Sequence, residues 1–353
     1  MTAEPLTVLL LFSSAEIGGA ERSLSRMAFS NKNPLVSYQL ATFGSAGTWS
    51  EWIESMFIKP HCFNYKIWSL LKYIYLTKPD VIYIVGFRLS VLLRFFCVFF
   101  SKSMLVQGVR WNPNSNSMLD RIFRLVEHGF SFLLDGYITN SNSTREVLNS
   151  IVKNKVELIY NGISYPLNKP SRNSQNNNVI TIANLSRRKG HRDYLKVISD
   201  IVKKVPSSQF LFLGYDNLNG EIQKLIVEEN LSSNVQYLGF QENVEHFLAK
   251  STIFVLPSKY GEGCPTSILE AFSFKLPVVA YRIDGIPELV SNNVDGVLVD
   301  VDDNDSLANA IEDLLLDPNK AENMGSKGYQ KVKENFLLND MIKQHNDYFL
   351  SLK

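Results

Sequence analysis

The chain has 353 residues, of which 45% are hydrophobic and 20% charged, an ordinary composition for a globular protein whose length favours two domains. Its three cysteines, Cys62, Cys97 and Cys264, are scattered and odd in number, which argues against a disulfide framework and fits a reducing cytosol. The opening residues lack the basic segment and apolar core of a signal peptide, so we expect a cytoplasmic protein.

Apolar runs alternate with helical patterns along the first half of the chain. Strands are predicted at residues 7–12, 36–43, 81–85, 104–107, 136–140 and 156–160, and helices at residues 18–29, 67–77, 89–100 and 117–134. Segment 89–100 is the most apolar one, but it contains Arg94 and is short, whereas a membrane-spanning helix needs about 20 residues. A transmembrane helix is therefore not expected.

Residues 164–178 are polar and rich in Pro, Asn and Ser, which predicts a linker. The alternation then restarts. Strands are predicted at residues 179–183, 209–214, 235–238, 253–256, 278–280 and 297–299, and helices at residues 190–204, 221–229, 244–249, 265–274, 306–317, 322–335 and 340–350.

Two successive series of alternating strands and helices predict two α/β domains, each with a parallel sheet covered by helices on both faces. The boundaries fall at residues 1–165 and 178–337, and we expect residues 338–353 to pack back on the first domain. Ligands of such sheets bind beyond the carboxyl ends of the strands. We therefore expect the functional site in a cleft between the two sheets.

The segment at 253–270 (IFVLPSKYGEGCPTSILE) runs from a buried strand through a Gly-rich loop into a helix. Pro265 suits the first turn of this helix, where its missing N–H costs nothing. N–H groups at the helix start form a ready site for a pyrophosphate. The N–H groups in question belong to Gly263, Cys264, Thr266 and Ser267. Glu262 precedes the helix and Glu270 lies within it, where a carboxylate can accept hydrogen bonds from a diol. The alternative is an ordinary strand-to-helix turn.

The stretch GEGCPTSILEA resembles the E-x7-E signature of the family 4, or group 1, retaining glycosyltransferases. The flanks VQYLGFQENV, PVVAYRIDGIPELV and NNVDGVLVD agree with it, so the resemblance covers most of residues 179–335. It implies the GT-B fold, in which two Rossmann-like parallel-sheet domains face a cleft. It further implies that Glu262 contacts the transferred sugar and that Glu270 holds the ribose hydroxyls of the donor.

In the first half, SSAEIGGAERSL resembles the glycine loop of the same family. Gly18 and Gly19 would let the backbone approach the donor phosphate, although a plain turn before a helix is the alternative. The loop lacks the G-x-G-x-x-G motif of dinucleotide-binding proteins, which argues against a dehydrogenase. ITNSNSTREVL and LIYNGI resemble the end of the acceptor domain, where we expect Asn161 and Gly162 to act mainly as a turn.

The stretch IANLSRRKGH resembles the family's phosphate-binding loop, usually written G-R-L-x-x-x-K-G. Lys189 takes the lysine position and would neutralise the leaving diphosphate. Asn184 replaces the usual arginine; it can donate a hydrogen bond but brings no charge. Arg187 or Arg188 would then supply the missing charge, unless both belong to a surface basic cluster.

The stretch LVQGVRWNPNSNS departs from the family in a second way, because Arg110 occupies the place where many relatives have a histidine beside the sugar. No histidine in this region can take that place. We expect surface or interface positions for His61, His128, His191 and His246. None of them has metal-ligand spacing, so no metal is expected.

The resemblance implies a retaining transfer of a hexose or N-acetylhexosamine from a nucleotide-sugar, with UDP as the nucleotide, to a lipid-linked glycan of O-antigen or capsule type. Catalysis would rest on Glu262, Lys189 and Arg110, without a cofactor, and no nucleic acid is expected as a partner. The alternatives are a non-catalytic nucleotide-sugar-binding partner, or another GT-B enzyme such as an inverting transferase or a nucleotide-sugar epimerase. An epimerase should carry additional acidic and histidine residues around the anomeric carbon, which the sequence does not show.

Charge is distributed unevenly along the chain. Residues 1–160 hold 16 Lys and Arg against 11 Asp and Glu, whereas residues 161–353 hold 20 against 24. Chance variation is one explanation. The other is a basic first domain that meets an anionic membrane surface or a phosphate-bearing acceptor, which would place the protein peripherally on the inner face of the cytoplasmic membrane. Segment 89–100 would then either pack on its sheet as a core helix or contribute to that surface.

Overall fold

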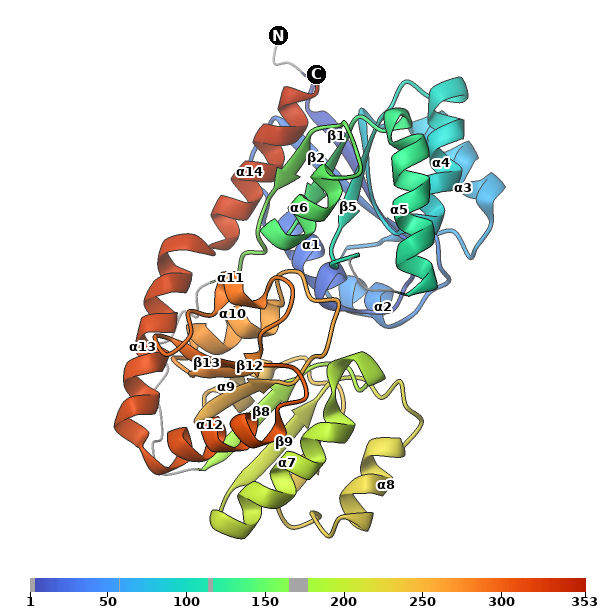
Figure 1. Cartoon of the computed structure of the whole chain (residues 1–353). Coiled ribbons are helices and arrows are strands. Elements are labelled where there is room, and N and C mark those ends of the chain that lie inside the picture. Colours follow the sequence, from blue (N-terminus) through green and yellow to red (C-terminus); the bar gives the residue numbers. More distant parts are fainter. Residues whose placement is uncertain (1–3, 57, 114–116, 165–176) are drawn as a thin grey trace. The chain divides into compact units, whose positions relative to one another are not determined.

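The chain divides into two compact units in a computed structural model that describes residues 4–56, 58–113, 117–164 and 177–353. One unit comprises Met1–Gly162 together with Leu338–Lys353, and the other comprises Ile163–Leu337 (Figure 1). Most of the predicted linker at 164–178 lies outside the described residues. Each unit is an α/β domain built on a parallel sheet, as the alternation in the sequence predicts.

The described residues of the first unit form a seven-stranded sheet in the order β3-β2-β1-β4-β5-β6-β7. The strands are β1 (Leu6–Phe12), β2 (Val36–Thr42), β3 (His61–Cys62), β4 (Val81–Val85), β5 (Met104–Val109), β6 (Gly136–Thr139) and β7 (Val156–Leu158). All pairings are parallel, and Leu10 of β1 lies between Leu40 of β2 and Tyr83 of β4. Helices cover both faces, which is why the central strands are continuous apolar runs.

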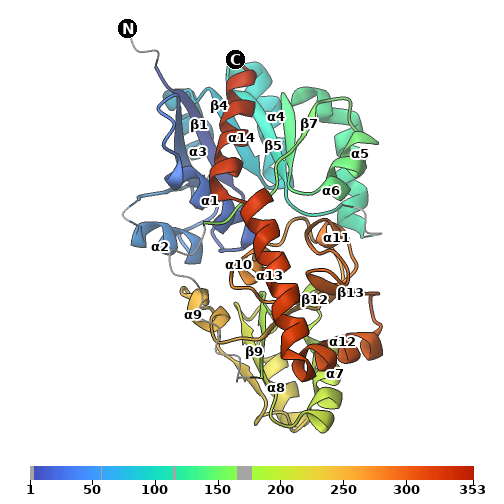
Figure 2. The same cartoon turned by 90° about the vertical axis from the view of Figure 1, so that its left-hand side faces the viewer.

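The helices of the first unit divide between the two faces of its sheet (Figures 1 and 2). They are α1 (Gly19–Ser30), α2 (Thr48–Ser55), α3 (Ile67–Thr77), α4 (Phe87–Phe100), α5 (Met118–Phe130), the 3-10 helix η1 (Ser131–Leu133), α6 (Asn142–Asn149) and α14 (Leu338–Ser351). Helices α3, α4 and α5 share one core with Ile82 and Ile84 of β4. Tyr83 points to the opposite face, where α1 and α14 contact each other.

Helix α14 completes the first unit, although it is the last element of the chain. Its Phe349 is fully buried, with its ring centroid 5.4 Å from that of Tyr83. Asn346 accepts a hydrogen bond of 2.7 Å from the Tyr38 hydroxyl and donates one of 2.9 Å to Asn31. The first unit therefore depends on a segment that follows the whole second unit in sequence.

The second unit has a six-stranded parallel sheet in the order β10-β9-β8-β11-β12-β13, counted over the described residues. Its strands are β8 (Asn178–Ile182), β9 (Gln209–Leu213), β10 (Val235–Tyr237), β11 (Ile253–Leu256), β12 (Val278–Tyr281) and β13 (Gly296–Val299). Its helices are the 3-10 helix η2 (Arg187–Lys189), α7 (His191–Lys204), α8 (Glu221–Glu228), α9 (Val244–Leu248), α10 (Thr266–Ser273), α11 (Ile286–Leu289), α12 (Asn304–Leu316) and α13 (Pro318–Asn335). The order reverses direction between β8 and β11, which is the point where doubly wound sheets bind ligands.

The structure corrects several details of the sequence prediction. The apolar patterns did not predict α2, β3, α6 and α11, all of which have eight residues or fewer. The helix predicted at 117–134 is α5 followed by η1. Pro265 is the N-cap of α10, with ψ at 114°, rather than part of its first turn. Among the described residues, no helix is long and apolar enough to cross a membrane.

Candidate functional site

A cluster of buried charge surrounds Glu262, which lies in the loop between β11 and α10 of the second unit. Lys189 Nζ lies 2.5 Å from Glu262 Oε1, and Arg188 Nη1 lies 3.2 Å from the same oxygen. Burial by itself would raise the pKa of Glu262, but the charges of Lys189 and Arg188 outweigh it and hold that pKa below its usual value. Glu262 is therefore a carboxylate at neutral pH, with two cations beside it.

The backbone around Lys189 is fixed against the loop that follows β11. Gly190 has φ at 71°, and a Cβ there would lie 2.0 Å from the carbonyl oxygen of Pro257, so only glycine fits. The Lys259 N–H donates to the Arg188 carbonyl at 2.9 Å, and the Arg188 guanidinium donates to the Gly261 carbonyl at 2.8 Å. These contacts position the two cations before any ligand arrives.

Asp284, in the loop after β12, holds the backbone on which Glu262 stands. Its carboxylate accepts hydrogen bonds from the N–H groups of Gly261 at 2.6 Å and Glu262 at 3.0 Å. The Gly285 N–H donates to the Glu262 carbonyl at 3.3 Å. The sequence analysis did not single out Asp284 as a functional residue, although it lies within the flank PVVAYRIDGIPELV.

The start of α10 has the features expected of an anion site. Its N-cap, Pro265, supplies no side-chain hydrogen bond to the first turn. The backbone N–H groups of the first helical turn therefore have no side-chain partner at the N-cap, and N–H groups at a helix start favour a negatively charged ligand. The residues predicted to bind the pyrophosphate surround this helix start, with Gly263 and Cys264 buried and Thr266 and Ser267 half-buried. Glu270 lies half-buried further along the same helix.

The replacement of the family arginine by Asn184 has a structural consequence. Asn184 Oδ1 accepts a hydrogen bond of 3.1 Å from the Tyr215 N–H, so its carbonyl oxygen joins the ends of β8 and β9. Arg188 is the neighbouring arginine that reaches Glu262, whereas Arg187 is exposed. Of the predicted donor-site residues, the structure thus brings Lys189, Arg188 and Glu262 into direct contact.

Arg110 follows β5 in the first unit and belongs to a second polar cluster. Its guanidinium donates to the Tyr83 hydroxyl at 2.7 Å and to Asn161 Oδ1 at 3.1 Å, and it lies 3.3 Å from His345 Nε2. Asn161 also accepts a hydrogen bond of 3.1 Å from Ser23. The prediction that Asn161 and Gly162 mainly form a turn is therefore wrong, because Asn161 is a buried acceptor and no turn is formed there.

His345 of α14 is the partner of Arg110 that sequence reasoning missed. Burial, together with the charge of Arg110, lowers the pKa of His345 to about 3, so the imidazole is neutral. An arginine can only donate, which makes Nε2 the acceptor and leaves the proton on Nδ1, 2.8 Å from the Met341 carbonyl. His345 thus orients Arg110 without adding a charge.

Gly18 and Gly19 lie where the chain passes from β1 into α1. Gly18 has φ at −130°, an ordinary extended value, and a Cβ there would lie 2.7 Å from Glu21 Oε2. Burial raises the pKa of Glu21 to about 7. Glycine at position 18 therefore makes room for the carboxyl group of Glu21, a residue that the sequence analysis did not select.

The histidine prediction is wrong for His191, which is fully buried at the start of α7 rather than at the surface. Its ring packs edge-on against Phe212 with the centroids 5.2 Å apart. Burial and the nearby charge of Lys189 lower the pKa of His191 to about 3. His61, His128 and His246 are exposed, as expected for surface residues.

Two Rossmann-like domains in one chain are found in solved structures that resemble this one. HepE from Anabaena, in complex with UDP and glucose, superposes with a TM-score of 0.84 at 21% identity, covering 98% of this chain and 100% of that one. Sucrose-phosphate synthase from Thermosynechococcus elongatus gives a TM-score of 0.81 at 18% identity, with 98% of each chain covered. The fold is therefore GT-B.

Residues 167–331, which make up most of the second unit, match the family model described as glycosyl transferases group 1. A glycosyltransferase of Methanocaldococcus jannaschii is 27% identical over 61% of this chain and 58% of its own length. The UDP-Gal:alpha-D-GlcNAc-diphosphoundecaprenol alpha-1,3-galactosyltransferase of Escherichia coli is 31% identical over 42% of this chain and 38% of its own length. The chain thus matches well under two thirds of the length of these relatives.

Proposed function

We propose that the protein is a retaining glycosyltransferase that moves a hexose or N-acetylhexosamine from a UDP-sugar to a lipid-linked glycan. The observation that carries this proposal is the Lys189–Glu262–Arg188 cluster in front of the α10 start. It combines a carboxylate, two cations and helix N–H groups, which is what recognition of a sugar diphosphate requires. The HepE structures with UDP and with UDP-glucose support UDP as the nucleotide.

The chemistry follows from the charges. A nucleotide-sugar already carries a good leaving group, so the protein must mainly stabilise the diphosphate as negative charge grows on it. Lys189, Arg188 and the N–H groups at Gly263, Cys264, Thr266 and Ser267 would supply this stabilisation. Glu262 would hold the sugar hydroxyls, and Glu270 the ribose diol. An acceptor hydroxyl that attacks from the face of the departing diphosphate would give retention.

The first domain would then bind the acceptor. Arg110 is held by Tyr83, Asn161 and His345, and a fixed guanidinium suits a phosphate-bearing acceptor or the donor phosphate. Gly18 and Gly19 would let the backbone approach the donor phosphate. The E. coli relative acts, by its name, on a diphosphoundecaprenol-linked sugar, and a Rhizobium meliloti relative is named for lipopolysaccharide core biosynthesis. These names support a cell-surface polysaccharide pathway and a peripheral position on the inner face of the cytoplasmic membrane.

The proposal is tested first by thermal unfolding with UDP, UDP-glucose, UDP-N-acetylglucosamine and GDP. A ligand at 100 times its dissociation constant should stabilise the native state by about 2.7 kcal/mol. If no nucleotide raises the melting temperature, the donor site is misassigned.

Glu270→Ala should keep the fold and weaken UDP binding by roughly 2–4 kcal/mol, because charge-assisted hydrogen bonds to the ribose are lost. Glu322→Ala, an exposed position on α13, is the matched control and should bind UDP normally. Unchanged UDP affinity in the Glu270 variant would contradict its role. Donor binding without transfer to an added glycan lipid would favour the non-catalytic alternative.

A further inference from the structure

Helix α4 presents apolar side chains to solvent and a charged side chain to the sheet. Its buried side includes Ser90 and the fully buried Arg94 beside Leu89 and Leu93. Its outer side carries large apolar residues that are 47 to 72% exposed, namely Leu92, Phe95, Val98, Phe99 and Phe100. A helix that covers a sheet ordinarily shows the reverse pattern, with charge outside.

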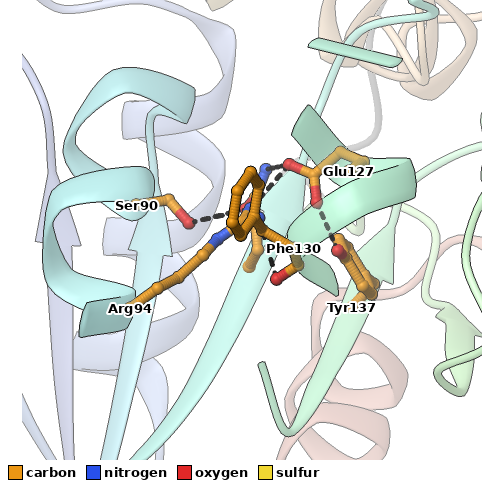
Figure 3. A network of polar contacts seen from close by, with 6 residues as sticks. Ser90, Arg94, Glu127, Phe130 and Tyr137 are labelled. Carbon is orange, nitrogen blue, oxygen red and sulfur yellow. Dashed lines mark hydrogen bonds and ion pairs between the residues drawn. The ribbon is translucent and has the colours of Figure 1, made fainter. Parts of the chain in front are cut away.

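The buried charge of α4 forms an ion pair and hydrogen bonds with neighbouring side chains (Figure 3). Arg94 Nη2 lies 2.6 Å from Glu127 Oε1 of α5 and 2.6 Å from Gln107 Oε1 of β5. Glu127 also accepts a hydrogen bond from the Tyr137 hydroxyl, and Ser90 donates to Gln107 at 2.6 Å. Rolling α4 to hide its phenylalanines would expose the sheet side and break this network. The outward position of the apolar residues is therefore fixed by the fold.

The exposed apolar surface continues over the neighbouring helices, which lie beside α4 on the same face of the sheet (Figure 1). Phe95 of α4 and Phe130 of α5 are in ring contact, with centroids 5.9 Å apart. Leu125 of α5 and Phe132 of η1 are each 73% exposed, and Trp68 of α3 is 80% exposed. We call the exposed apolar side chains of α3, α4, α5 and η1 the apolar face.

All the exposed charges on these helices are basic. Lys72 of α3, Arg88 of α4 and Arg121 of α5 are exposed, whereas the acidic residues of the three helices, Asp120 and Glu127, are buried. Near the helix ends, the lysines at positions 66, 78 and 102 are exposed as well, against one exposed acidic residue, Asp135. A surface with apolar and aromatic side chains among cations matches the boundary between acyl chains and anionic headgroups.

We propose that the apolar face docks on an anionic lipid bilayer, with its aromatic and aliphatic side chains inserted at the level of the headgroups. The occupant is a lipid surface rather than an acidic protein, because the exposed apolar side chains are spread over α3, α4, α5 and η1 and cations lie among them. The inference deepens the proposed function and rests on it for the lipid-linked acceptor, which this contact would bring to the first domain.

The test is co-sedimentation of the full chain, without donor, with vesicles of phosphatidylcholine alone and of phosphatidylcholine mixed with phosphatidylglycerol. The protein should bind the anionic vesicles, and high salt should weaken that binding. Leu125→Gln and Phe99→Gln should each weaken it about tenfold or more, because apolar area is lost. Leu316→Gln in α12 of the second unit, where the leucine is 71% exposed, is the matched control and should bind like the wild type.

Replacing Lys72, Arg88 and Arg121 by Gln should lower binding to anionic vesicles by about fivefold for each charge and remove the preference over neutral ones. Absence of binding, or equal binding of the wild type to both vesicle types, would overturn the proposal. So would a lipid-free dimer that Leu125→Gln dissociates, because the face would then join two copies. UDP affinity is measured on the same variants, so failure of lipid docking is distinguished from failure of the donor site.

Discussion

Each of the two domains buries an acidic side chain beside at least one cation, but the two clusters differ in the groups that surround the carboxylate. In the first domain, Glu127 is enclosed between α4, α5 and the sheet, and Arg94, Gln107 and Tyr137 satisfy it. In the second domain, Glu262 lies in a loop beyond the end of β11, and Lys189 and Arg188 both contact its Oε1. Protein atoms complete the first site, whereas the second stands at the edge of the sheet where ligands bind. The two ion pairs thus differ in their position in the fold, one inside a domain and the other at the edge where doubly wound sheets bind ligands.

The two domains also differ in the large apolar side chains that they expose to solvent. Most of the large apolar side chains that are exposed in the described part of the chain belong to the apolar face of the first domain. The exposed ones of the second domain are Val227, Tyr260, Val294, Val301 and Leu316, which are scattered along its sequence. Scattered exposure of this kind is normal, whereas a contiguous patch indicates an interaction surface.

The largest effect should come from acid, because each domain holds a histidine with a pKa lowered to about 3, His345 in the first and His191 in the second. Below pH 6.5 the unfolded chain binds a proton at each of these positions that the native chain does not bind. The contribution of these two histidines to the free energy of unfolding should therefore be constant above pH 7 and fall as the pH drops from 6.5 towards 3, by roughly 4–5 kcal/mol for each histidine at the lower end. Glu21, whose pKa is raised to about 7, acts in the opposite direction and offsets part of this loss between pH 7 and 4.5. Urea unfolding at a series of pH values measures this loss.

The variants His191→Phe and His345→Phe test the contribution of each histidine separately. Neither ring nitrogen of His191 has a hydrogen-bond partner among the described residues, whereas His345 contacts Arg110 and Met341. The first variant should keep its stability at pH 7, and the second should lose about 1–3 kcal/mol because Arg110 loses an acceptor. Both should show a shallower dependence on acid. An unchanged acid profile in both variants would contradict the assignment.

The next effect concerns how much the Arg94–Glu127 ion pair of the first domain contributes to the free energy of unfolding. Arg94→Met should destabilise the protein by about 3–5 kcal/mol, because it leaves Glu127 buried without its cation. Arg94→Met combined with Glu127→Leu should recover most of this loss, since no charge remains buried. Measurement is by urea unfolding of the single and double variants at pH 7. A single variant as stable as the wild type would show that the network is not needed to hold α4.

The last effect concerns the Lys189–Glu262 pair of the proposed donor site. Lys189→Ala should lower turnover by about 10²–10³-fold and change donor binding much less, because the ammonium acts chiefly on charge that develops during the reaction. Initial rates at varied donor concentration measure it, and Lys204→Ala, an exposed lysine of α7 paired with Glu312, is the control. A raised Michaelis constant with normal turnover would mean that Lys189 only binds the donor.

The sequence predicted the elements that have a strong local signal and missed contacts that depend on distant residues. The alternation of apolar runs was sufficient for both parallel sheets, and the loop before α10 identified Glu262. Arg94 interrupts an apolar run and could be recognised as a buried ion only through Glu127, 33 positions away in sequence. Asp284 and His345 were missed for the same reason, because what they do is defined by Glu262 and Arg110 on other elements.

The return of α14 to the first domain has a consequence for how the protein is made. A ribosome releases residues 1–162 long before residues 338–353 exist, so the side of the first sheet that α14 covers has to wait for the entire second domain. Until then Tyr38 and Tyr83 lack their packing partner Phe349, and Arg110 lacks His345. The nascent first domain therefore exposes apolar surface on this side throughout synthesis of the second.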